Sequence, residues 1–231
     1  MKTVVINMFA GSGAGKTTCA WEVASELKKR GFITEYVAEY AKELVWEKNF
    51  TMLDGTLQHQ RQLLTEQAHR LERLVSQVDF IVTDSPLFLN ALYYTKGTPE
   101  RKKAYTDEVY RAFSSYENFS VFIKRGKGFE KAGHIHDLEQ SKKIDQNIKN
   151  LLQEYHVFYG IYTYETAHLV VDNCIRTYRR VNLIERGSYV QEEPEDREPT
   201  ENLGKKAEEI TEKRDEMSLK LRRILNPEEG Y

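Results

Sequence analysis

Hydrophobic residues in the first 170 positions alternate between short continuous runs and longer stretches with helical spacing. Residues 3–9 form an apolar run that ends at a glycine cluster, which is typical of a strand buried on both faces. Residues 16–29 instead place apolar side chains at the spacing of one helix face. Strands that alternate with helices predict an α/β fold with a parallel sheet covered on both faces. The predicted strands are 3–9, 33–38, 79–84, 118–124, 158–163 and a further short one at 168–171, and the predicted helices are 16–29, 57–78, 87–94, 100–116 and 138–155.

The composition of the chain changes near its C-terminus. Glu, Asp, Pro and Thr dominate residues 191–202, which is typical of an acidic linker. Apolar residues then recur at heptad spacing and predict a helix, although Arg214 interrupts the apolar seam. We therefore divide the chain into an α/β domain (1–190), the linker (191–202), and a C-terminal helical tail (203–231). We expect this tail to pack on the body of the protein or on the same helix of a second chain, which would make a homodimer.

Composition and charge exclude several classes of protein. Of the 231 residues, 40% are hydrophobic and 30% are charged, close to the average of soluble globular proteins. No apolar run approaches the ~18 residues that a membrane span needs, so no membrane partner is expected. Two cysteines cannot form a disulfide framework, and the N-terminus lacks a signal-peptide pattern. These features predict a cytoplasmic protein, in the host cytoplasm if the protein is viral.

The net charge of −2 is unevenly distributed. Residues 191–231 hold 13 acidic and 8 basic side chains, a net charge of −5, whereas residues 1–190 hold 26 basic and 23 acidic side chains, a net charge of +3. A weakly positive body suits a phosphorylated small molecule better than a long nucleic-acid track, which usually has a strongly basic surface.

A glycine-rich segment lies directly between the first predicted strand and the first predicted helix. Its glycines let backbone amides converge on phosphate oxygens, and the helix N-terminus adds positive charge at the same place. In this pattern Lys16 reaches the β- and γ-phosphates, and the Thr17 hydroxyl ligates Mg²⁺. Ala10 replaces the first glycine of the pattern, a departure that other phosphate loops share. The predicted ATP-binding residues are Gly11, Ser12, Gly13, Ala14, Gly15, Lys16, Thr17 and Thr18.

Several classes of phosphate-loop protein are excluded by what the sequence lacks. It contains no Asn/Thr-Lys-x-Asp guanine-recognition motif, no glycine three residues after Asp84 and no transporter signature, and it is too short for an AAA+ module with a helical lid. The remaining group is that of small-molecule kinases, which close a lid over two bound substrates.

Two further segments carry a resemblance to a known family. Residues 39–43 (EYAKE) follow the second predicted strand, and residues 82–86 (VTDSP) follow a long helix rich in Gln and Arg. With the phosphate loop, they resemble small phage-encoded P-loop proteins labelled AAA-type ATPases. Roughly residues 1–165 are similar to the ribosylnicotinamide kinase domain of the bacterial NAD regulator and, more distantly, to nucleoside and nucleotide kinases. The resemblance implies a nucleotide-kinase-like P-loop NTPase, a three-layer sandwich that uses ATP and Mg²⁺.

Two carboxylates follow predicted strands. Asp84 lies at the carboxyl edge of the sheet, where ligands of open α/β sheets bind, and could hold Mg²⁺ or accept the proton of the acceptor hydroxyl; the alternative is a helix cap. In the resembling kinases, a carboxylate near Glu39 contacts the acceptor hydroxyl; the alternative is a solvent-facing glutamate. The sequence leaves open which of the two is the general base.

Residues 124–131 contain four cations and two glycines and follow the fourth predicted strand. Phosphoryl-transfer sites use cations to neutralise charge on the transferred group, and the resembling kinases carry their lid at this place. We therefore expect Arg125 and Lys127 to be catalytic, with Lys124 behind them. The alternative is a plain basic surface loop.

Aromatic residues could stack on an acceptor ring, although an aromatic at helical spacing more often belongs to the core. Trp46, Phe88 and Tyr93 are the candidates. Residues 172–174 follow the last apolar run, where kinases of this type often hold adenine through backbone contacts.

These features predict an ATP- and Mg²⁺-dependent kinase that phosphorylates a nucleoside, a nucleotide or a related small hydroxyl compound. One alternative is a kinase that acts on nucleic acid, either DNA or a hydroxymethylated base in phage DNA. A second alternative, favoured by the heptad-spaced tail, is an ATP-hydrolysing switch that binds a protein partner.

Overall fold

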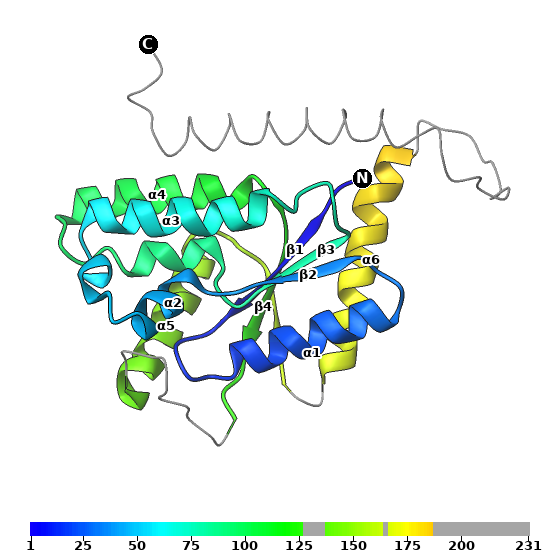
Figure 1. Cartoon of the computed structure of the whole chain (residues 1–231), viewed down its shortest axis with the longest axis horizontal. Helices are drawn as coiled ribbons and strands as arrows, with labels where there is room; N and C mark the ends of the chain where they lie inside the picture. The colour runs from blue at the N-terminus through cyan, green and yellow to red at the C-terminus, as the bar shows by residue number, and fades with distance from the viewer. Residues whose placement is uncertain (127–136, 164–165, 187–231) are drawn as a thin grey trace, which may run out of the picture.

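The computed structural model describes residues 1–126, 137–163 and 166–186. Its five strands form one parallel sheet in the order β2-β3-β1-β4-β5 (Figure 1). The predicted parallel sheet is therefore confirmed. Lys127, the predicted linker and the predicted C-terminal tail lie outside the described residues. The strands are β1 (Val4–Phe9), β2 (Thr34–Val37), β3 (Phe80–Thr83), β4 (Glu117–Ile123) and β5 (Tyr159–Tyr162).

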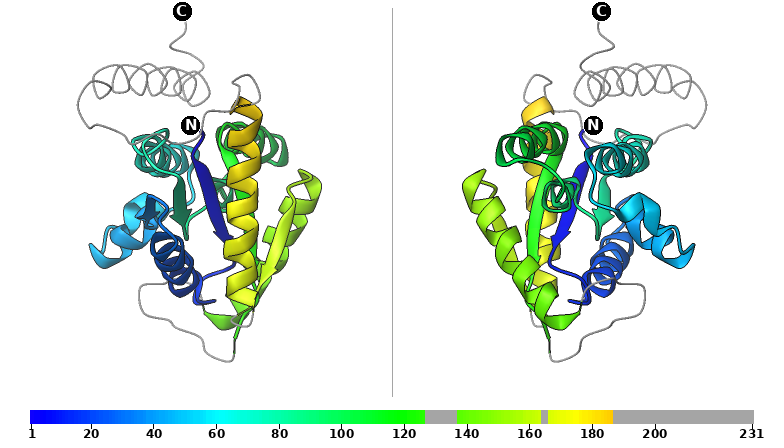
Figure 2. Two further views of the ribbon diagram at one scale, coloured as in Figure 1. Left: turned by 90° about the vertical axis from the view of Figure 1, so that its right-hand side faces the viewer. Right: turned by 90° about the vertical axis from the view of Figure 1, so that its left-hand side faces the viewer.

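Helices cover both faces of the sheet. The helices are α1 (Lys16–Lys29), α2 (Tyr40–Trp46), α3 (Leu57–Glu72), α4 (Pro99–Ser114), α5 (Leu138–Glu154) and α6 (Ala167–Arg186), with 3-10 turns η1 (Phe50–Leu53) and η2 (Leu87–Leu92). Helices α1 and α6 pack on one face, and α3, α4, α5 and η2 pack on the other. Figure 2 shows α6 in front of the strands from one side. The described residues thus form a three-layer sandwich. Within them, no helix has the length and apolar character of a membrane span.

The central strand β1 is covered by helices on both faces, which explains the apolar run in residues 3–9. Val4, Ile6 and Met8 face the layer of α1 and α6, whereas Val5 and Phe9 face the layer of α3 and α4. All five side chains are buried. Alternate residues of a strand point to opposite faces, so a strand covered on both faces is largely apolar. Asn7 is the polar exception in β1, and its buried amide donates a hydrogen bond to Asn118 at 2.9 Å.

Three sequence predictions of secondary structure are wrong. The long helix from residue 57 ends at Glu72, because the chain turns through Ser76, whose φ is +64°. The stretch at 87–94 forms the 3-10 turn η2 rather than an α-helix. The short strand expected at 168–171 is instead the first part of α6, and residues 172–174 continue that helix. The apolar side chains of α6 lie on one helix face against the sheet. The four residues 168–171 are too few to show this helical period in the sequence.

Asp79 joins three elements at the amino end of the sheet. Its buried carboxylate accepts hydrogen bonds from the Ile33 amide at 2.8 Å and from the Tyr178 hydroxyl at 2.5 Å. Ile33 precedes β2, Asp79 precedes β3, and Tyr178 lies on α6. This carboxylate therefore ties helix α6 to the chain entering two strands.

We predict that Asp79→Ala lowers the free energy of unfolding by about 1–3 kcal/mol, because it leaves buried donors without their acceptor. Urea unfolding followed by circular dichroism measures the loss. Asp172→Ala is the matched control, since Asp172 also lies on α6 but forms an exposed ion pair with Arg30. Its removal should cost less than about 1 kcal/mol. Equal losses in the two variants would contradict this role of Asp79.

Candidate functional site

The phosphate loop connects β1 to α1 and contains two backbone conformations that favour glycine. Gly13 has φ +64° and Gly15 has φ +92°, in the left-handed region that side chains with a Cβ rarely adopt. Gly15 is the N-cap of α1 and provides no side-chain cap, and the first turn holds no acidic residue. The amides at this helix N-terminus are therefore suited to an anionic ligand. Ala10 is buried and does not have a positive φ, so alanine fits there without strain.

Lys16 and Thr17 open α1 and point to the carboxyl edge of the sheet. The Lys16 Nζ atom donates a hydrogen bond to the Gly11 carbonyl oxygen at 3.2 Å, so its ammonium lies across the loop. The Thr17 hydroxyl donates to Asp84 Oδ2 at 2.5 Å. Asp84 directly follows β3, and the parallel pairing of β1 with β3 places the ends of both strands together. The structure thus brings together residues predicted from two separate parts of the sequence, the phosphate loop and the end of β3.

Asp84 has the properties of a group that helps to hold a cation. It is only 2% exposed, and its Oδ1 atom is buried without a hydrogen-bond partner among the described residues. Mg²⁺ prefers oxygen ligands and usually takes only one or two from protein, with phosphates and waters completing its octahedron. The Thr17 hydroxyl and Asp84 carboxylate fit such a shared site. The described residues contain no cluster of three or more His, Cys, Asp or Glu side chains that would hold a metal by themselves.

Glu39 lies close to this group and is the N-cap residue of α2. Burial raises the pKa of its carboxyl; Lys16 and Lys42 oppose the shift, and the negative charge of Asp84 reinforces it. Tyr36 on β2 is also nearby, and burial together with Asp84 raises the pKa of its phenol, so that it stays protonated. The site therefore holds two carboxylates in different environments, the usual arrangement when one of them moves a proton.

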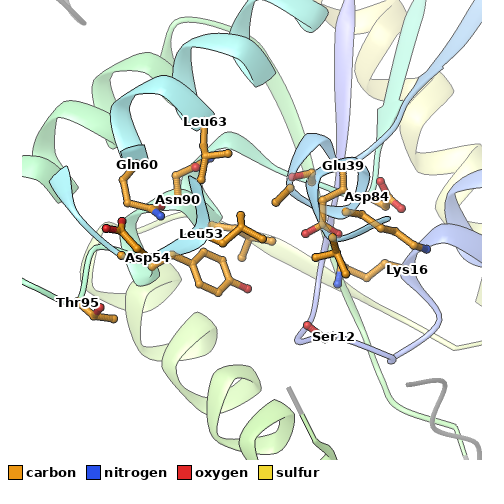
Figure 3. A pocket seen from close by; sticks show the side chains of 17 residues that line it. Ser12, Lys16, Glu39, Leu53, Asp54, Gln60, Leu63, Asp84, Asn90 and Thr95 are labelled. Atoms are coloured by element: carbon orange, nitrogen blue, oxygen red, sulfur yellow. The ribbon is translucent and has the colours of Figure 1, made fainter. Parts of the chain in front are cut away.

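A cavity of about 250 Å³ begins at the phosphate loop and extends between α2, η1, α3 and η2 (Figure 3). At one end lie Ser12, Lys16, Glu39 and Asp84, and Ser85 also lines the cavity. The far end is also polar, and an apolar section separates the two ends. The remaining lining residues are Ala41, Lys42, Val45, Leu53, Asp54, Gly55, Gln60, Leu63, Leu89, Asn90, Tyr93 and Thr95. A second molecule bound in this cavity would meet the reactive end of a nucleotide held by the loop.

Of the three aromatic candidates, only Tyr93 lines the cavity. Trp46 is 63% exposed at the end of α2, and Phe88 is fully buried and stacks on Phe113 in the core.

Arg125 follows β4 and is bound to the outside of the phosphate loop. Its guanidinium pairs with Asp145 and donates to the Ser12 carbonyl oxygen at 3.0 Å. Asp145 also accepts from the Gly11 amide at 2.6 Å, and the Ser141 hydroxyl donates to Ser12 O at 2.5 Å. In this structure Arg125 is therefore a fixed cation that braces the loop, rather than one carried on a free lid.

Sequence reasoning missed Asp145, Ser141, Gln60 and Asp54. Ser141 and Asp145 lie one turn apart on α5, where a polar face looks like any solvent-exposed one. Gln60 lies on the long polar helix α3, where the sequence does not distinguish it from the exposed glutamines; in the structure it is buried, as is Gln67.

Comparisons with known proteins give a family and a similar fold. A protein-family model described as an AAA domain matches residues 5–164. The chain is similar in fold to the NadR protein solved in complex with NR, with a TM-score of 0.57 and 15% identity. The match covers 84% of this chain but only 54% of the NadR chain, so this chain spans about half the length of that protein. Lower similarity extends to Chaetomium thermophilum Kti12 in complex with ADP-AlF3 (TM-score 0.43, 13% identity, 75% of this chain and 98% of that one). The Mycobacterium tuberculosis APS kinase CysC in complex with AMPPNP and APS gives a TM-score of 0.38 at 14% identity, over 80% of this chain and 98% of that one. No curated protein matches the chain in sequence.

We predict that Gly11→Ala weakens ATP binding about tenfold. An added Cβ would lie 2.5 Å from the Ser141 carbonyl oxygen and 2.8 Å from Arg125 Nη2. Relieving such an overlap costs about 1–3 kcal/mol, and the loop is the part that must shift. Titration calorimetry with ATP and Mg²⁺ measures the change. Gly160→Ala is the control, because nothing lies within 4 Å of its added Cβ. Wild-type affinity in Gly11→Ala would show that the brace does not fix the loop.

Proposed function

The chain belongs to the AAA domain family whose model spans residues 5–164, and from this premise we propose that it is an ATP- and Mg²⁺-dependent kinase. The proposed acceptor is a nucleoside, a nucleotide or a related small hydroxyl compound. The observation that carries the proposal is the cavity that opens beside the phosphate loop, with Lys16, Glu39 and Asp84 at its inner end. Pure nucleotide switches need no second substrate cavity at this place.

The residues of the site support each part of phosphoryl transfer. The loop amides and Lys16 would bind the β- and γ-phosphates, and Thr17 with Asp84 would hold Mg²⁺. Mg²⁺ supplies charge neutralisation at the phosphates when bound. As the bond from the acceptor oxygen to phosphorus forms and the β–γ bridging bond breaks, Glu39 or Asp84 would take the hydroxyl proton. Arg125 would hold the loop in place during the step.

The size of the cavity favours a small acceptor over nucleic acid. Its volume of about 250 Å³ is near the lower limit of small-molecule pockets, roughly 300 Å³. A screen of nucleosides, nucleotides and oligonucleotides, incubated with ATP and read by mass spectrometry, tests the proposal directly. Phosphorylated oligonucleotides alone would favour the nucleic-acid kinase, and ATP hydrolysis unaffected by every acceptor would favour the nucleotide switch.

Lys16→Ala should lower phosphoryl transfer at least ~100-fold, the loss typical of one preorganised charge at a transition state. The fold should stay intact by circular dichroism, since the ammonium contacts the loop rather than the core. Lys29→Ala is the matched control: Lys29 ends the same helix, and its side chain is exposed. Its turnover should equal that of the wild type. Near-normal transfer in Lys16→Ala would exclude the loop as the site.

The pH dependence of kcat/KM should identify the general base. A carboxylate must be ionised to accept a proton, so activity falls as the pH drops through its pKa. Because burial raises the pKa of Glu39 above its ordinary value of 4.5, the acid limb should lie above that pH and should be lost in Glu39→Gln. An unchanged acid limb in Glu39→Gln would assign the proton transfer to Asp84.

A further inference from the structure

Glu39 enters the cavity from the start of α2, and a side chain of another helix fixes that start. We propose that Gln67 is a positioning residue for phosphoryl transfer, because its side-chain amide holds the backbone on both sides of Glu39. Gln67 lies on α3, is 2% exposed, and is not among the residues that line the cavity. The inference rests on the proposed function and adds to it a residue that acts through Glu39.

The Gln67 side chain makes two hydrogen bonds to the segment that joins β2 to α2. Its Oε1 atom accepts from the Tyr40 amide at 3.0 Å, and its Nε2 atom donates to the Ala38 carbonyl oxygen at 3.1 Å. Each half of the side-chain amide thus meets the complementary backbone group. Because the two bonds lie on either side of Glu39, they fix the backbone from which the carboxylate extends.

The bond to Tyr40 also replaces a cap that α2 otherwise lacks. The first amides of a helix have no partner within the helix, and the side chain of the N-cap residue usually bonds one of them. Glu39 is the N-cap residue, with φ −68° and ψ 114°, and its side chain makes no capping hydrogen bond. Gln67 bonds the Tyr40 amide instead, so the Glu39 carboxylate is not needed by the helix. It lines the cavity at the same end as Lys16 and Asp84 (Figure 3).

Arg70 holds α2 about one turn further along α3. Its guanidinium donates to both carboxylate oxygens of Glu43, at 2.6 and 2.7 Å, and lies 4.7 Å from the centre of the Tyr40 ring. Glu43 is in the first turn of α2. A two-bond pair of this kind fixes orientation as well as distance. Rotation of α2 on α3 would therefore break this pair as well as the two bonds of Gln67.

The position of Glu39 matters more for the rate of transfer than for the binding of ATP. Water solvates an ionised carboxylate better than a protein cavity does, so a loosened Glu39 would turn toward solvent. A displacement of about 1 Å at a reacting group can lower a rate about 100-fold. The phosphates of ATP would be bound by the loop between β1 and α1, which belongs to other elements. Loss of the Gln67 bonds should therefore lower kcat and leave the KM for ATP unchanged.

Hydrogen exchange read by mass spectrometry tests the two bonds without depending on turnover. Gln67→Met keeps the length of the side chain but removes both polar groups, so the amides of residues 38–43 should exchange at least tenfold faster in the full chain. Gln62→Met is the matched control, because Gln62 is exposed on the same helix, and it should exchange like the wild type. Unchanged exchange at 38–43 in Gln67→Met, or an equal increase along all of α3, would overturn the inference.

A double-mutant cycle tests whether Gln67 acts through Glu39. The rate of transfer from saturating ATP is measured on the mixture of nucleosides and nucleotides used in the screen. Gln67→Met should lower this rate ten- to hundredfold and change the KM for ATP less than twofold. In Glu39→Gln, the same substitution should lower the residual rate less than twofold further, because residues that act as one unit are not additive. A wild-type rate in Gln67→Met, or equal losses in both backgrounds, would overturn the inference.

Asp79→Ala separates positioning from a simple loss of stability. It breaks buried hydrogen bonds at the amino end of the sheet, whereas Glu39 follows the carboxyl end of β2. Its rate per folded molecule should stay within twofold of the wild type, and a loss as large as that of Gln67→Met would overturn the inference.

A second substitution keeps the test valid if Gln67→Met fails to fold. Gln67→Glu retains an oxygen for the Tyr40 amide and loses only the donor to Ala38. It should lower the rate at least threefold, and this loss should disappear in the Glu39→Gln background. A folded Gln67→Glu protein with the wild-type rate would overturn the inference.

The inference and the proposed function fail in different ways. Faster exchange at residues 38–43 in Gln67→Met, in a protein whose wild type phosphorylates no acceptor, would support the two bonds and contradict the kinase. Transfer by the wild type that Gln67→Met leaves unchanged would support the kinase and overturn the inference.

Discussion

The parallel pairing of β1 with β3 is the constraint on which the rest of this site depends. It places the phosphate loop, which follows β1, beside Asp84, which follows β3, so that the Thr17 hydroxyl reaches the carboxylate at 2.5 Å. A shift in this register would separate the loop from its partner, because a one-residue slip reverses the face of every side chain. Such pairing needs helical crossovers that cover both faces, and these produce the apolar strands and the three layers.

The phosphate loop is also held from its outer side. Its amides must remain directed at a ligand, so the loop cannot be stabilised by packing on that face. The structure places the fixing contacts elsewhere: Asp145 accepts from the Gly11 amide, and Arg125 binds both Asp145 and the Ser12 carbonyl. Because Gly11 lies against α5 without room for a Cβ, the glycine here serves close packing, whereas Gly13 and Gly15 serve the backbone turn.

Sequence patterns predicted local structure well where the spacing of apolar residues stayed regular over several turns, or where a motif such as the phosphate loop was complete. The helix at residues 16–29 has the predicted bounds, and each strand of the sheet lies within two residues of its prediction at either end. The errors came from short or composite signals. Four apolar residues at 168–171 belong to the long helix α6, since only the following turns show which face is buried. The helix beginning at Leu57 stopped at Glu72 because of a turn that the apolar spacing alone does not mark.

The sequence by itself determined the α/β class, the phosphate loop and the two carboxylates that follow strands, because each depends on neighbours in the chain. Tertiary structure alone decided the rest. The contact of Arg125 with Asp145, and the place of Gln60 in the same cavity as Glu39, join residues of separate elements. A glutamine in a polar helix gives no local signal that its side chain is buried. The burial of the side chains that line the cavity, and the balance of charge in it, are set only when α2, α3 and η2 pack around the same space. Both depend on distances between residues that are remote in sequence.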